Sequence, residues 1–307
     1  MMQKKEWNKG FAAGGFFITF CGAILFSTKA IIVKLAFAQV SVDALTLLTL
    51  RMVFSLPFYL IAAYVVSNKQ TNVKLTLRQG ILTVITGLLG YYVSSYLDFV
   101  GLMYISAGLE RLILFLYPTF AVLINSFLFG QRIEKNQRIA LLLTYIGIGI
   151  AFWGELGIDA GNPHFFLGSL LVFLCSITYA FYIVGSGKMI PQTGATKFTA
   201  YAMLGATSGI FIHFLLKGDY SFLHQHGAIW GYGFLLALIA TVIPSFLISL
   251  GMKKIGSNNV AILSSIGPVS TIVQAHYFLG EKIFAEQIIG TVLVVVGVLL
   301  LGKRRKI

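Results

Sequence analysis

The chain alternates between long apolar runs and short polar connections from one end to the other. Each run approaches or exceeds the roughly 20 residues that a helix needs to cross a bilayer. The runs are apolar on all faces, and backbone in lipid must satisfy its own hydrogen bonds, so they are predicted to be helices. A membrane β-barrel would instead show shorter segments of alternating polarity. The ten runs are residues 11–34, 44–66, 79–103, 106–129, 137–154, 165–187, 198–216, 229–251, 257–279 and 284–302.

Composition agrees with a membrane protein. Of the 307 residues, 57% are hydrophobic and only 11% are charged, whereas soluble domains average about 25% charged residues. The two cysteines, Cys21 and Cys175, both lie in apolar runs. We therefore interpret them as small packing residues, and the sequence indicates neither a metal site nor a cofactor.

Basic residues set the predicted orientation. The formal charge of +13 would suit a nucleic-acid-binding protein, but the Lys and Arg residues recur in short clusters between apolar runs. That distribution is typical of cytoplasmic loops under the positive-inside rule. Lys4, Lys5 and Lys9 precede the first run without a convincing cleavage site, so this run is interpreted as an uncleaved helix. The prediction is a multi-pass protein of the plasma membrane (the bacterial inner membrane), with both termini cytoplasmic and no nucleic-acid partner.

An internal repeat appears when the sequence is shifted by 150 residues. Several glycines and prolines then coincide, among them Gly101 with Gly251, Pro118 with Pro268, Gly130 with Gly280, and Gly147 with Gly297. Two helix pairs with similar packing needs would be the alternative explanation. Pro118 and Pro268 are candidate hinges, because proline removes a helix hydrogen bond and crowds the preceding turn.

The repeat divides the chain into residues 1–154 and 155–307, with five helices in each half. Because five is odd, the halves must lie in the membrane with opposite orientation. The predicted fold is therefore all-α, with ten transmembrane helices arranged as two inverted five-helix repeats. Many secondary transporters share this architecture and work by alternating access to a site near the midplane.

Particular residues resemble a known family. Gly130-Gln131-Arg132-Ile133 and Gly280-Glu281-Lys282-Ile283 are similar to the Gly-Glu-Arg turn of the drug/metabolite transporter superfamily, EamA type. In that family the turn follows a helix with a central proline, as at Pro118 and Pro268, and precedes a glycine-rich helix. Leu50-Arg51-Met52 with Pro57, and Lys34, are similar to its second and first helices. The resemblance implies ten helices and export or exchange of small metabolites, often amino acids or drugs. Gln131 departs from the pattern, so an ion pair of Glu281 need not have a twin.

Charged residues within the spans are the main candidates for a substrate or coupling site. A charge inside a span costs about 2.5–3.5 kcal/mol on insertion scales, so it usually faces a cavity or a partner. The candidates are Lys29, Arg51, Asp98, Glu110 and Arg111, with Tyr92 and Tyr179 as possible pocket-lining hydroxyls. They are expected to bind a small-molecule substrate, with Asp98 or Glu110 relaying a proton. The alternative is that they snorkel or pair to close the outer face.

Other functions are less compatible with the sequence. No clustered acid, base or nucleophile and no phosphate-binding loop is present, which argues against an enzyme or an ATP-driven pump. His213 and His276 lack metal-ligand spacing. A channel or membrane scaffold without coupled transport is the remaining alternative. The sequence therefore predicts a secondary transporter for amphipathic metabolites in the lipid bilayer, and it leaves substrate, direction, energy source and a homodimer open.

Overall fold

In the computed structural model the described residues are 2–68, 74–130, 133, 135–158, 162–220, 227–264 and 266–302, and within them the chain forms helices and no strands. Gln131 and Arg132 of the first Gly-Glu-Arg-like turn lie outside these residues. The helices of the first half are α1 (Met2–Gln39), α2 (Ala44–Ser67), α3 (Leu77–Gly87), η1 (Leu88–Val93), α4 (Ser94–Leu102), α5 (Ala107–Leu114), α6 (Tyr117–Phe129) and α7 (Lys135–Ile158). The helices of the second half are α8 (Phe165–Thr193), α9 (Ala195–Lys217), α10 (Ala228–Ala237), η3 (Leu238–Val242), α11 (Ile243–Ser264), α12 (Ile266–Leu279) and α13 (Ala285–Gly302).

Eight helical segments of the described chain are long and apolar enough to span a membrane, and Ala285–Leu300 is a shorter apolar helix. The prediction of an all-helical membrane protein is thereby confirmed. The apolar run at 257–279 corresponds to the end of α11 and to α12, which are not among the eight. The preceding span, Ala228–Gly256, ends at a glycine whose φ of 81° interrupts the helical backbone within α11. Large exposed apolar side chains, such as Phe127 at 85% and Trp153 at 75% exposure, suit a surface covered by lipid.

Helical irregularities recur at equivalent positions of the two halves. The π-helical segment η1 begins at Leu88, and η3 begins at Leu238, its mate under the 150-residue shift. The fourth span is broken after α5, and α6 begins with Pro118 in its first turn, where the missing N–H of proline costs no hydrogen bond. Pro268 likewise lies in the first turn of α12. Both candidate hinge prolines therefore follow a helix boundary.

Two pairs of helices that the 150-residue shift relates pack against each other in antiparallel fashion. In the pair α7 and α13, a β-carbon added at Gly290 would lie 2.4 Å from the carbonyl oxygen of Gly147, and one added at Gly297 would lie 2.9 Å from that of Ala140. The chain number rises on one helix as it falls on the other. Glycine is required at Gly147 and Gly290 because the two backbones touch there.

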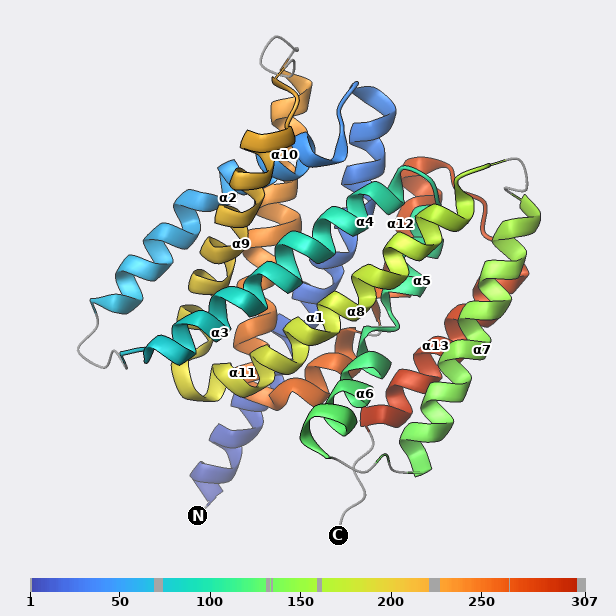
Figure 1. The fold of residues 1–307 in the computed structure, drawn as a ribbon. Coiled ribbons are helices and arrows are strands. Elements are labelled where there is room, and N and C mark those ends of the chain that lie inside the picture. Colours follow the sequence, from blue (N-terminus) through green and yellow to red (C-terminus); the bar gives the residue numbers. More distant parts are fainter. Residues whose placement is uncertain are drawn as a thin grey trace.

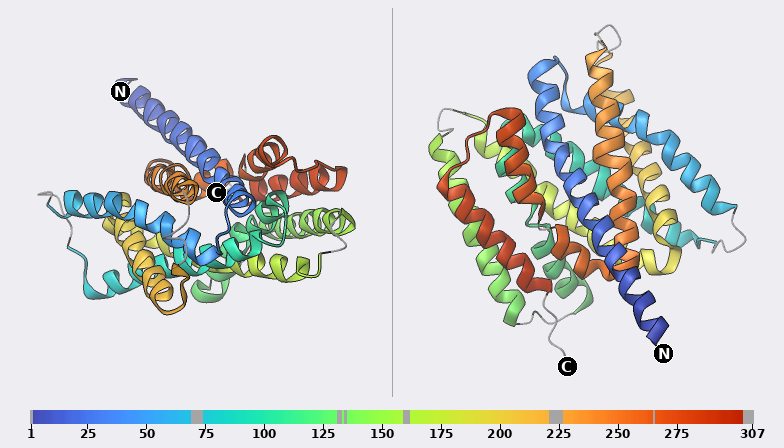
Figure 2. Two further views of the ribbon diagram at one scale, coloured as in Figure 1. Left: turned by 90° about the horizontal axis from the view of Figure 1, so that it is seen from above. Right: turned by 180° about the vertical axis from the view of Figure 1, so that it is seen from behind.

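The pair α2 and α9 is also antiparallel. The hydroxyl of Ser67, at the end of α2, is hydrogen-bonded to that of Tyr201, near the start of α9, at 2.9 Å. At the opposite ends, Leu45 and Leu50 share an apolar cluster with Phe214. Figures 1 and 2 show the resulting bundle, in which α1 begins and α13 ends at the same end of the molecule. The central helices α1, α4, α5 and α8 carry the candidate site.

Candidate functional site

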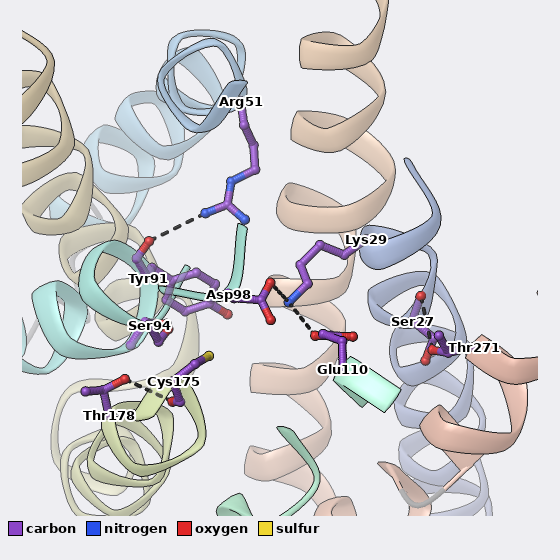
Figure 3. Close-up of polar contacts among 11 residues, drawn as sticks. Ser27, Lys29, Arg51, Tyr91, Ser94, Asp98, Glu110, Cys175, Thr178 and Thr271 are labelled. Atoms are coloured by element: carbon purple, nitrogen blue, oxygen red, sulfur yellow. Dashed lines mark hydrogen bonds and ion pairs between the residues drawn. The ribbon is translucent and has the colours of Figure 1, made fainter. Parts of the chain in front are cut away.

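Three charged side chains from three helices meet in the interior. The ammonium of Lys29 in α1 lies 2.6 Å from Oδ2 of Asp98 in α4 and 3.5 Å from Oε1 of Glu110 in α5. Both carboxylates are fully buried, and the Lys29 side chain is 6% exposed. Figure 3 shows the two carboxylates converging on the one ammonium. We call these three residues the ionic cluster.

The ionic cluster is short of hydrogen-bond donors. Apart from the ion pairs with Lys29, none of the four oxygens of Asp98 and Glu110 has a hydrogen-bond partner within the described residues. A buried carboxylate without donors is costly in a low-dielectric interior. With all three groups ionised the cluster carries one net negative charge, which one added proton would neutralise.

Arg51 of α2 lies beside the ionic cluster. The residue is 2% exposed, and one of its terminal nitrogens donates to the carbonyl oxygen of Tyr91 over 3.5 Å. Its guanidinium lies over the ring of Phe99, 5.1 Å from the ring centre, as expected of a cation–π contact. The Nε atom is buried without a hydrogen-bond partner among the described residues. Arg51 therefore keeps unused donor capacity.

Arg111 follows Glu110 in α5 but belongs to a different environment. A terminal nitrogen donates to the hydroxyl of Ser27 over 3.1 Å, and the guanidinium lies 5.6 Å from the ring centre of Phe26. Gly267 makes room for this side chain, because a β-carbon there would come within 2.6 Å of the guanidinium. No carboxylate of a described residue forms a salt bridge with Arg111.

Two adjoining cavities border these charges. The smaller one, which we call the lysine cavity, is lined by Lys29, Arg51, Asp98 and Cys175 among others. The larger one, the tyrosine cavity, is lined by Arg111 and by the four tyrosines Tyr91, Tyr117, Tyr179 and Tyr182. Tyr91 and Tyr179 line both cavities. The tyrosine cavity receives side chains from both halves of the chain, since Ile248, Met252 and Val260 complete its wall.

The aromatic side of the tyrosine cavity is ordered by ring contacts. Tyr179 stacks on Tyr182 with ring centres 5.6 Å apart, and it meets Tyr117 edge to face at 5.1 Å. Tyr91 meets Tyr182 edge to face at 5.0 Å. Gly90 lets the backbone of η1 lie close to Tyr182, because a β-carbon at this position would come within 2.4 Å of the tyrosine side chain.

The structure brings most of the predicted site residues together. Lys29 forms ion pairs with both Asp98 and Glu110, Arg51 and Arg111 flank them, and Tyr179 lines both cavities. Tyr92 differs: its ring packs against His213 of α9, with ring centres 5.9 Å apart, and it lines neither cavity. Pro118 directly follows the cavity residue Tyr117, and Pro268 directly follows Gly267, which contacts Arg111.

Several site residues were not singled out from the sequence. Phe26 precedes Lys29 by about one helical turn, and that spacing could have placed it on the same face, whereas Ser27 is only two residues away and gave no such signal. Tyr117 stands directly before Pro118 in the first half. Cys175 gave no signal beyond its apolar surroundings. In the part of the chain that the structure describes, no three His, Cys, Asp or Glu residues lie close enough to hold a metal ion.

Polar contacts join several connections at one end of the bundle, the end opposite the start of α1 (Figure 1). Glu281 accepts hydrogen bonds from the backbone N–H groups of Ala107 and Gly108 at the start of α5. Lys34 donates to the carbonyl oxygen of Ile105 over 2.9 Å. Asn162 donates to that of Tyr104 over 2.6 Å. The contacts of Glu281 and Lys34 thereby hold the start of α5, the helix that carries Glu110, and Ile105 just before it.

Comparison with known proteins adds family information. The model of the EamA-like transporter family matches residues 13–153 and again residues 166–303. An uncharacterized transporter of Bacillus subtilis, YcbK, is 27% identical over 91% of this chain and 89% of its own. The biotin transporter of Escherichia coli K12 is 25% identical over 60% of this chain and 61% of its own. A solved crystal structure shares the fold with a TM-score of 0.67 at 18% identity, covering 94% of this chain and 96% of the other.

Proposed function

Because this chain belongs to the EamA-like transporter family and is a multi-pass membrane transporter, we propose that it exports or exchanges small amphipathic metabolites by alternating access. The observation that carries the proposal is the pair of adjoining cavities, lined by Arg111 from one half and by Ile248 and Val260 from the other, beside a buried ionic cluster. A site between two halves can be exposed to either side as the halves tilt.

The two halves are proposed to be inverted repeats of five helices each, residues 1–154 and 155–307. Three findings support this division. The π-helical segments recur at the 150-residue spacing, the two family matches fall one in each half, and the equivalent helices α7 and α13 run antiparallel. Mates that run antiparallel are what an inverted repeat requires.

The proposed topology places both termini in the cytoplasm. The positive-inside rule assigns to the outside the connections that contain or adjoin Lys34, Asn162 and Glu281. The hydrogen bonds of these three residues lie together at one end of the bundle. The start of α1 and the end of α13 lie at the opposite end. This arrangement supports an outer face closed over the ionic cluster in the conformation seen here.

Proton coupling through the ionic cluster is the second part of the proposal. Asp98 and Glu110 share a single ammonium and lack other donors. A proton on one carboxyl group would let it donate a hydrogen bond and would reduce the repulsion between Asp98 and Glu110. Intramembrane carboxylates of this kind are typical of proton relays.

Flux through purified protein in proteoliposomes tests the proposed function. Amino acids, biotin and cationic drugs would be screened, each with and without a pH gradient. We expect at least one compound to show uptake that saturates and that is accelerated by unlabelled compound on the opposite side. Flux that does not saturate and shows no such exchange would indicate a channel, and no flux of any compound would contradict the proposal.

The inverted topology has its own test. Single cysteines at Asn68 and Pro163, in a background with Cys21→Ala and Cys175→Ala, would be treated with a membrane-impermeant thiol reagent on intact cells. Pro163→Cys should be labelled, and Asn68→Cys should be labelled only after permeabilisation. Labelling of both positions from the same side would rule out the opposed halves.

A further inference from the structure

The interior charges do not balance. The ionic cluster and its two arginine neighbours comprise the three cations Lys29, Arg51 and Arg111 and the two carboxylates Asp98 and Glu110, all of them buried. With all five groups ionised, one positive charge remains in excess. An uncompensated buried charge is strongly unfavourable, so the site is best completed by one negative charge.

Arg111 is the cation best placed to receive that negative charge. Lys29 is already bound to two carboxylates, and Arg51 lines the same cavity as the carboxylate of Asp98, whereas Arg111 lines the other cavity and forms no salt bridge with a carboxylate of the described residues. The Arg111 residue is 5% exposed, and its Nε atom is buried without a hydrogen-bond partner in that part of the chain. Ser27 occupies only one of its five donors by a hydrogen bond. A planar guanidinium with unused donors matches a carboxylate in charge and in geometry.

Gly267 of the second half leaves room for the guanidinium of Arg111, because it has no side chain. The 150-residue shift pairs Gly267 with Tyr117. Where the first half has an aromatic side chain, the second half has none, and the guanidinium of Arg111 lies against the bare backbone. Arg111 itself is paired by the shift with Ala261, so the cation has no counterpart. Arg111 and Gly267, which touch each other, are therefore both positions at which the two halves differ in residue type.

The rest of the tyrosine cavity is suited to an apolar body. Helix α11 contributes the apolar side chains of Pro244, Ile248, Met252 and Val260 to its lining, with Ser264 at the end of the helix, and Ile248 and Val260 are the shift mates of Asp98 and Glu110. Tyr91, Tyr117, Tyr179 and Tyr182 supply most of its aromatic lining. Aromatic rings with hydroxyls at their edges pack against apolar groups and still offer hydrogen bonds.

We propose that the tyrosine cavity binds an amphipathic monocarboxylate, with the carboxylate on Arg111 and the apolar body among the tyrosine rings and the apolar side chains of α11. This inference rests on the proposed function and narrows its substrate class. The cavity is small in this conformation, so the proposal requires it to widen when the halves move. Arg51 faces the lysine cavity and has a secondary role, as a nearby positive charge.

Matched acid and amide pairs test the proposal directly. Binding to the protein in lipid nanodiscs, at one fixed pH, would be measured for hexanoate, 3-phenylpropionate and 4-phenylbutyrate and for the three corresponding primary amides. We expect at least one acid to bind about tenfold or more tightly than its amide, as for a charge-assisted hydrogen-bonded pair. If no acid binds more tightly than its amide, the proposal is wrong, whatever the variants show.

Variants then identify the cation responsible. Arg111→Gln should abolish the preference for acid over amide, Arg111→Lys should keep part of it, and Arg78→Gln, a charge loss at the exposed start of α3, should leave it unchanged. The acid-to-amide ratio is taken within each preparation, so it does not depend on the folded fraction. An unchanged preference in Arg111→Gln would overturn the assignment.

Flux in the same proteoliposomes separates this proposal from the proposed function. Saturable exchange of neutral or cationic compounds, without exchange of any of the acids, would refute the carboxylate class and leave the transporter proposal standing. Absence of saturable flux for every compound would refute the transporter proposal itself.

Discussion

Glu281 caps the first turn of α5 from the other half of the chain. Its Oε1 accepts a hydrogen bond from the backbone N–H of Ala107 over 2.8 Å, and its Oε2 accepts one from Gly108 over 3.2 Å. A carboxylate at a helix N-terminus is favoured both by the free N–H groups and by the helix dipole. The bond therefore joins the second half to the short helix that carries Glu110 and Arg111.

Loss of this cap should loosen the closed end of the bundle. We expect Glu281→Ala to lower stability by about 1 to 2 kcal/mol, the usual cost of a lost N-cap, and Glu281→Gln to lie between it and the wild type, since the amide keeps one acceptor oxygen. The thermal unfolding midpoint in detergent would order the three proteins. Equal midpoints for Glu281→Ala and the wild type would show that the contact contributes nothing.

Removal of the shared ammonium should be costly. Lys29→Met leaves Asp98 and Glu110 facing each other without a cation, and breaking a buried ion pair from one side costs about 3 to 5 kcal/mol. We expect a large fall in the unfolding midpoint and a partial recovery when Glu110→Gln is added. Lys74→Met, at an exposed position, is the control. A double variant no more stable than Lys29→Met alone would contradict the shared-ammonium arrangement.

Proton coupling predicts a selective loss in carboxylate variants. Glu110→Gln or Asp98→Asn should reduce the stimulation of transport by a pH gradient and spare exchange under symmetric conditions, because exchange needs no net proton movement. Both rates would be measured in proteoliposomes. If both variants keep full gradient-driven transport, the ionic cluster does not couple protons.

The close contact between α7 and α13 makes a steric prediction. Gly290→Ala would place a β-carbon 2.4 Å from the carbonyl oxygen of Gly147, so the backbones must separate. We expect a lower unfolding midpoint and less folded protein in the membrane fraction. Gly149→Ala is the matched control, because a β-carbon at Gly149 meets no atom within 4 Å. A normal midpoint for Gly290→Ala would mean that the two helices are not in contact.

The paired prolines should affect transport rate more than binding. If the boundaries before α6 and α12 act as hinges, Pro118→Ala and Pro268→Ala will favour continuous helices and slow alternation several-fold, with substrate affinity retained. Pro163→Ala, at an exposed position before α8, serves as the control. Unchanged exchange rates in both variants would remove the hinge role.

The cluster geometry illustrates how far prediction from the sequence extends. Lys29, Asp98 and Glu110 could each be recognised as site candidates, because a charge in an apolar run is conspicuous. Their mutual contact could not be predicted, since a helix that is apolar on all faces gives no sign of its rotation about its own axis. Tyr92 illustrates the same limit: the sequence predicts a possible pocket-lining hydroxyl, and only the structure shows that its ring packs against His213.

The sequence by itself therefore determined the helices, the internal repeat and the candidate charged residues. An uninterrupted apolar run specifies a helix and its solvent, a 150-residue shift reveals the repeat, and isolated charges identify the candidate site. Tertiary structure decided which residues meet: Glu281 on the start of α5, Arg111 against Gly267, and four tyrosines around one cavity. The physical reason is that side-chain contacts between helices depend on how neighbouring helices rotate and cross, and those variables are fixed only when all the helices pack together.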